Sequence, residues 1–172
     1  MRSFRIRRLA LSALLVTVML ILGYVESLVP TGMPGIKLGL SNSVLILAVV
    51  WLGIPTAFAL MIGKVLLSGF LFSGVNAMLY AFAGGLLSMI VMSVLYKTKA
   101  FSLTPVAMAG AVAHNVGQVA MAMLILQTGK LVYYMAVLMF VGLGTGFVTG
   151  TVASVLIRRL PGSLLPKDGT GP

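Results

Sequence analysis

Three polar side chains stand close together in a stretch that carries no formal charge between Lys99 and Lys130. They are His114, Asn115 and Gln118, and their neighbours are alanine, glycine, valine and methionine. On a helix that turns by about 100° per residue, Gln118 lies about 40° and Asn115 about 100° from His114, on the same side. An imidazole and two amides on one face can bind a ligand by hydrogen bonds, or they can join helices to each other inside a membrane.

Two charged residues in apolar surroundings extend this candidate site. Lys64 lies in the middle of an apolar stretch, and Glu26 is the only acidic residue before the carboxyl-terminal tail. A charged lysine near the middle of a bilayer costs about 2.5–3.5 kcal/mol on insertion scales, so Glu26 is its expected counter-ion, unless Glu26 pairs with Lys37 instead. Either the ion pair is structural, or Lys64 and Lys37 receive an anionic group of a ligand. Asn42, at the start of an expected helix, either caps that helix or contacts the ligand.

The composition places these residues in a membrane. Of the 172 residues, 60% are hydrophobic and 8% are charged, which is too little polar surface for a soluble domain of this size. Since a membrane-spanning helix takes about 20 residues, the length predicts a compact, all-α bundle of six transmembrane helices. Apolar runs and their breaks place these helices at 9–28, 40–52, 55–72, 76–96, 103–127 and 131–157. We expect a single domain over residues 1–160 and a flexible cytoplasmic tail over 161–172.

The net charge of +10 comes from basic residues at the ends of the expected helices. If the amino terminus is cytoplasmic, the outer loops hold only Lys37 and Lys130, and the inner segments hold Arg2, Arg5, Arg7, Arg8, Lys97, Lys99, Arg158, Arg159 and Lys167. This asymmetry predicts that both termini are cytoplasmic. The basic residues form no patch with interleaved aromatic residues, which disfavours nucleic acid as a partner. We expect a multi-pass protein of a bacterial plasma membrane.

Several kinds of chemistry are disfavoured by the residue types that are scarce. The chain has no cysteine, one histidine and two acidic residues, so we expect neither a disulfide nor a thiolate nucleophile nor a metal site. The sequence contains neither the phosphate-binding loop of an ATPase nor the clustered aspartates that bind magnesium diphosphates. No nucleophile, base and orienting acid can be assembled around His114. We therefore expect a protein that is not an enzyme and that uses no cofactor.

Glycines recur at four-residue spacing on the last expected helix, at Gly142, Gly146 and Gly150. Small side chains let helix backbones approach closely in a membrane, where no hydrophobic effect drives helices together. The glycines either pack inside the bundle or form a docking face for a partner membrane subunit.

Four blocks of sequence carry a resemblance to a known family. They are YVESLVP at 24–30, PGIKLGLSN at 34–42, AGGLLS at 83–88 and GAVAHNVGQ at 110–118. In order and spacing they resemble the heptaprenyl diphosphate synthase component I family, also called the Gx transporter family, over about residues 9–158. That family is similar to the substrate-binding S components of energy-coupling factor (ECF) transporters.

The resemblance implies a six-helix membrane protein that captures a small molecule from outside, under its first outer loop. It implies that the protein works with a transmembrane coupling subunit and two ATPase subunits. By this analogy the substrate-binding positions are Glu26, Lys37, Asn42, Lys64, His114, Asn115 and Gln118. S components often dock to the coupling subunit through alanines at four-residue spacing in the first helix, where this chain has Ala10 and Ala13, three residues apart.

Three hypotheses about function follow. The first is a transport subunit that binds a small anionic or amphipathic substrate and is energised by partner ATPases. The second is a noncatalytic membrane component of a complex that makes prenyl diphosphates or quinones. The third is a small ion-coupled carrier with Glu26 and His114 as its protonatable groups.

Overall fold

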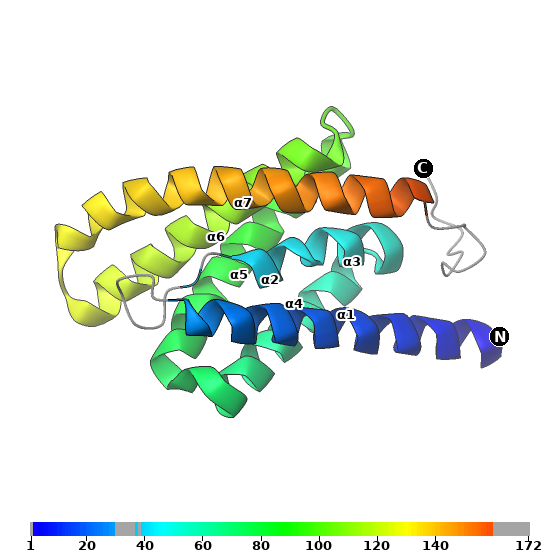
Figure 1. Ribbon diagram of the computed structural model, residues 1–172, viewed down its shortest axis with the longest axis horizontal. Helices are drawn as coiled ribbons and strands as arrows, with labels where there is room; N and C mark the ends of the chain where they lie inside the picture. Colours follow the sequence, from blue (N-terminus) through cyan, green and yellow to red (C-terminus); the bar gives the residue numbers. More distant parts are fainter. Residues whose placement is uncertain (1, 30–36, 38, 160–172) are drawn as a thin grey trace.

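We describe the fold from a computed structural model of the chain, which places residues 2–29, 37 and 39–159 (Figure 1). The tail expected at 161–172 lies outside the described residues. The apolar stretches form helices, and no strand occurs in the described part of the chain. The helices are α1 (Arg2–Leu28), α2 (Leu40–Ser43), α3 (Leu45–Leu52), α4 (Ile54–Ser68), α5 (Gly74–Thr98), α6 (Leu103–Leu126) and α7 (Val132–Arg159). A π-helical segment, η1 (Gly69–Ser73), joins α4 to α5, and a 3₁₀ turn, η2 (Gly129–Leu131), precedes α7.

The chain folds back on itself between α4 and α5. Gly74 has a φ of 80° and a ψ of 168°, which is a backbone conformation that a residue with a side chain rarely adopts. Beyond this corner, Met78 packs on Gly69 and Gly85 packs on Met61. The contact partner on α4 moves back from Gly69 to Met61 as the partner on α5 moves forward from Met78 to Gly85. The two helices therefore run in opposite directions.

The prediction of six separate membrane helices is not supported. Four helical stretches are long and apolar enough to cross a membrane: Arg5–Leu28, Ile54–Thr98, Leu103–Leu126 and Gly129–Arg159. The break expected near residue 73 is a π-helical corner inside one of these stretches, and not a loop. Together with the shorter apolar helix Leu40–Leu52, these four make five continuous helical stretches in the described chain. At 1.5 Å per residue the shorter helix is only about 20 Å long, against about 30 Å for the hydrocarbon layer.

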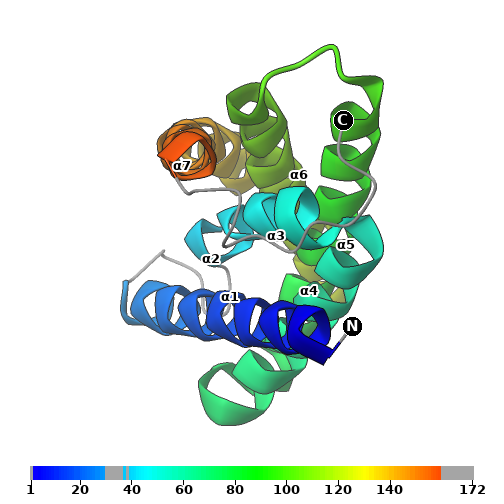
Figure 2. The ribbon, with the colours of Figure 1, turned by 90° about the vertical axis from the view of Figure 1, so that its right-hand side faces the viewer.

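The short helices α2 and α3 form the centre of the molecule. Figure 2 shows them between α1 and α7, with α4, α5 and α6 beside them. The main hydrophobic core surrounds them and includes Leu45, Ile46, Met61, Met89 and Val106, which are all fully or almost fully buried. A helix that carries polar residues is therefore held inside an apolar bundle.

The start of α1 and the end of α7 lie at the same end of the bundle (Figure 1). The start of α6, just after the turn between α5 and α6, lies beside the last turns of α7, because the hydroxyl oxygens of Thr104 and Ser154 are 3.4 Å apart. The basic residues that we assigned to inner segments and that the structure describes therefore gather at one end, which we call the basic end. It contains Arg2, Arg5, Arg7, Arg8, Lys97, Lys99, Arg158 and Arg159. The end of α1 and the turn between α6 and α7, which contains Lys130, lie at the opposite end.

Candidate functional site

Glu26 joins the end of α1 to the start of α2. Its carboxylate is buried and accepts hydrogen bonds from the backbone amide of Leu40 at 2.6 Å and from that of Ser41 at 3.4 Å. The first amides of a helix have no acceptor within the helix, so a carboxylate at this position satisfies donors that would otherwise be buried and unpaired. In the described part of the chain, Glu26 makes no direct ion pair with Lys37 or Lys64, and its oxygens accept the two amides instead. Its negative charge still acts on both lysines.

Lys37, which precedes α2, forms hydrogen bonds with two other parts of the chain. Its backbone amide donates to Gln118 Oε1 at 3.0 Å, and its Nζ donates to Ser73 Oγ at 2.6 Å. The ammonium also lies 4.9 Å from the centre of the Phe72 ring, a distance typical of a cation–π contact. Burial lowers the pKa of Lys37, and the negative charge of Glu26 opposes part of this effect. The lysine is thus held by neutral partners, and its burial disfavours the charged form.

The polar face of α6 lies next to Lys37 and Gly39. Gln118 Nε2 is hydrogen-bonded to His114 Nε2, and Asn115 Nδ2 donates to the carbonyl of Leu138 on α7 at 2.7 Å. Because Gln118 Oε1 already accepts from Lys37, its NH₂ group faces His114, so His114 Nε2 is the acceptor. All three side chains are buried, and the predicted common orientation of this face toward the protein interior is confirmed.

Close packing holds the polar face of α6 against its neighbours. A Cβ atom added to Gly39 would lie 3.3 Å from the His114 ring, and one added to Gly84 would lie 2.8 Å from His114 Nδ1. Glycine in the connector and glycine on α5 therefore leave the room that the imidazole fills. The histidine is enclosed from both sides by the backbone.

Asn42 and Lys64 complete the set of buried polar residues. Both are buried, at 2% and 4% exposure. Neither polar atom of the Asn42 amide has a hydrogen-bond partner, and neither does Asn115 Oδ1. Lys64 makes no hydrogen bond within the described residues, although it lies close enough to Glu26, Lys37 and His114 for their charges to interact. The seven predicted residues are therefore all buried around the start of α2, and we call them the polar cluster.

The arrangement of the polar cluster suits binding. It offers amide donors and acceptors, one carboxylate and two lysines. Lys37, one of these lysines, lies outside the helices. No three metal-ligating side chains come together in the described parts of the sequence.

The residues expected at a partner interface fall into two groups. Gly142, Gly146 and Gly150 are buried against α6, where Cβ atoms added to them would lie within 3 Å of Asn115, Met108 and Thr104, in that order. Their spacing is used for packing within this chain. Ala10 and Ala13 lie exposed on α1.

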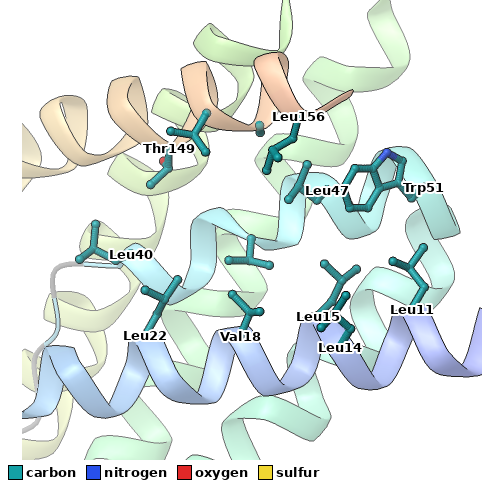
Figure 3. A pocket seen from close by; sticks show the side chains of 13 residues that line it. Leu11, Leu14, Leu15, Val18, Leu22, Leu40, Leu47, Trp51, Thr149 and Leu156 are labelled. Atoms are coloured by element: carbon teal, nitrogen blue, oxygen red, sulfur yellow. The ribbon is translucent and has the colours of Figure 1, made fainter. Parts of the chain in front are cut away.

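An apolar groove that the sequence analysis missed lies between α1 and α7 (Figure 3). Its volume is about 530 Å³. The floor is formed by α2 and α3, and the sides by α1 and α7. Leucine and valine at helical spacing on α1, from Leu11 to Leu22, were the available signal. In an apolar membrane helix such a stripe does not stand out from the other faces.

The family of the chain follows from comparison with family models. The model of the heptaprenyl diphosphate synthase component I family matches residues 15–156. The chain belongs to this family. The matched region confirms the resemblance inferred from the four sequence blocks, and it contains the whole polar cluster and most of the apolar groove. No curated protein and no solved structure matches the chain.

Proposed function

We propose that this family member is a noncatalytic membrane subunit that binds a small anionic or amphipathic molecule for transport, in the manner of an S component. The observation that carries the proposal is the group of unpartnered amide atoms in the polar cluster, at Asn42 and at Asn115. Leaving a buried polar group unpaired costs about 1–3 kcal/mol, so such atoms are expected where a ligand completes their hydrogen bonds.

The charges of the polar cluster favour an anion. Lys37 and Lys64 outnumber Glu26, and the Glu26 oxygens already accept two backbone hydrogen bonds. An anionic group on the ligand would offset the cost of burying the two lysines. We propose that the substrate brings this group.

The orientation follows from the basic end. We propose that this end faces the cytoplasm of a bacterial cell, because basic residues are retained on the cytoplasmic side of the plasma membrane. The opposite end of the bundle, where α1 ends, then faces outward and meets the substrate first. A transmembrane coupling subunit and two ATPase subunits would supply the energy, with Ala10 and Ala13 on the exposed face of α1 as docking positions.

Mass spectrometry of small molecules retained by the purified protein tests the substrate site. We expect the wild-type protein to carry a molecule that is lost from Lys64→Met and His114→Ala variants, which still insert and fold. Lys130→Met is the matched control, because Lys130 is exposed at the same end of the bundle, outside the polar cluster. If both cluster variants keep the molecule that the control keeps, the assignment of the site is wrong.

A second candidate function is a noncatalytic membrane component of a complex that makes prenyl diphosphates or quinones. The family description and the apolar groove, which suits a hydrocarbon chain, favour it. Affinity purification from native membranes separates the two functions. Recovery of a coupling subunit and ATPases supports transport, whereas recovery of a soluble prenyl diphosphate synthase supports the second function.

A further inference from the structure

The apolar groove exists because α1 and α7 hardly touch each other, while both contact α2 and α3. On its floor, Leu40, Val44, Leu47 and Trp51 follow one another at spacings of four, three and four residues, so they share one face. Thr149 carries the hydroxyl among the lining residues, and this hydroxyl donates to the carbonyl of Thr145 at 2.7 Å. Apart from Nε1 of Trp51, which is buried and has no hydrogen-bond partner, the lining side chains offer an occupant no free hydrogen-bonding group.

The length and lining of the groove suit a hydrocarbon chain. From Leu11 to Leu22 the groove follows α1 for about 17 Å, roughly half of the hydrocarbon layer. Its lining is almost entirely leucine and valine. One or two lipid chains are the occupants of suitable size and polarity within a bilayer.

The two ends of the groove differ in charge. At the basic end it is lined by Leu11 and Leu156, and two arginine pairs lie within about 6 Å of these residues along the helix axes, at Arg7 and Arg8 on α1 and at Arg158 and Arg159 on α7. Arg158 and Arg159 are exposed. At the other end, Glu26 continues the lining stripe of α1 one turn beyond Leu22. An amphiphile with an anionic head is therefore favoured in one direction only, with its head at the basic end.

Arg8 is positioned at this mouth by the protein. Its guanidinium donates to the carbonyl of Leu52 at 3.1 Å and to Thr56 Oγ1 at 3.0 Å. These bonds fix α1 to the turn between α3 and α4, next to Trp51 at the end of the groove floor.

We propose that the apolar groove binds an anionic phospholipid of the bilayer, with an acyl chain between α1 and α7 and its phosphate on the arginines of the basic end. This site is separate from the polar cluster. Asn42 lies about 160° around α2 from Leu40, so the cluster and the groove use opposite faces of that helix. The proposal does not depend on the transport function.

Native mass spectrometry of the full chain tests the proposal, after exchange into vesicles of phosphatidylcholine with and without phosphatidylglycerol. We expect the wild-type protein to retain phosphatidylglycerol in preference to phosphatidylcholine. Replacing both Arg158→Gln and Arg159→Gln should lower retention of phosphatidylglycerol about 30-fold, which is about 2 kcal/mol for two charges. The double replacement Lys97→Gln and Lys99→Gln is the matched control, because these two exposed lysines lie at the same end but away from the groove.

A second pair of variants tests the acyl chain. Val152 lines the groove and is 53% exposed, so Val152→Trp should fill the groove without disturbing the core and should abolish retention of both lipids. Val155→Trp is its control, because Val155 is exposed on α7 outside the groove. Equal retention of the two lipids, or retention unchanged in the arginine variants, would overturn the proposal. Retention of a prenyl diphosphate instead of a phospholipid would also overturn it, and would favour the second candidate function.

Discussion

Replacing Glu26 by glutamine should destabilise the protein through both its hydrogen bonds and its charge. The carboxylate accepts the amides of Leu40 and Ser41 at 2.6 and 3.4 Å, and a hydrogen bond to a charged group is worth about 1.5–3 kcal/mol. Glutamine keeps one oxygen acceptor but turns an NH₂ group toward the second amide. We therefore expect a loss of about 2–3 kcal/mol, or a fall of about 4–12 °C in the melting temperature for a chain of this size.

The charge contribution of Glu26 can be separated by a double-mutant cycle with Lys64. In Glu26→Gln, Lys64 loses the only described carboxylate that acts on it. Removing the lysine charge as well, in Glu26→Gln with Lys64→Met, should recover at least about 0.5 kcal/mol relative to the sum of the single changes. Thermal unfolding in detergent, followed by circular dichroism, measures all four proteins. A Glu26→Gln protein that melts with the wild type, or a Lys64→Met change with equal effect in both backgrounds, would refute the reasoning.

Three further predictions concern other parts of the same architecture. Gly146→Val should separate α6 from α7, since even a Cβ atom added at this position would lie 2.6 Å from Met108 Cα. This variant should lower the yield of folded protein in size-exclusion chromatography. Gly144→Val is the control and should fold at normal yield, because no atom lies within 4 Å of its added Cβ. Gln118→Leu leaves the amide of Lys37 without its acceptor and should lower the free energy of unfolding by about 1–3 kcal/mol, which urea titration of the detergent-solubilised protein would detect. Burial lowers the pKa of Lys37, so the lysine loses its charge as the pH rises through this lowered pKa. As the pH is raised, retention of an anionic ligand should therefore begin to weaken before the pH reaches the ordinary lysine pKa of about 10.4. The Lys37→Arg protein should retain the anionic ligand to a higher pH than the wild type, because arginine stays charged. Equal pH profiles of ligand retention for both proteins would contradict this role of Lys37.

The burial of the polar cluster could be predicted from the sequence, because a membrane allows polar side chains few places. His114, Asn115 and Gln118 on an apolar helix had to face protein, and they do. Local spacing was enough to place them on one side of α6.

The partners of these residues could not be predicted in the same way. Glu26 was expected to pair with a lysine, but its oxygens bind the first amides of α2, whose position depends on the path of the preceding connector. The apolar groove depends on a gap between α1 and α7, which are more than a hundred residues apart in the sequence. The predicted number of membrane helices is not supported for a related reason. Glycine and serine indicated a loop near residue 73, but residues 69–73 form a π-helical corner that keeps the helical hydrogen bonding.

The hydrogen bonds of the polar cluster divide its residues by the roles left open to them. Glu26 and Gln118 are used to hold the connector, and the NH₂ group of Asn115 is used to hold α7. The capacity that remains lies in both amide atoms of Asn42, in the side-chain oxygen of Asn115, in Nδ1 of His114 and in the ammonium of Lys64. Three of these groups donate and two accept hydrogen bonds, and one carries a positive charge. A ligand that satisfies them must present hydrogen-bond donors beside an anionic or strongly accepting group, so a simple inorganic anion would leave the two amide oxygens unpaired.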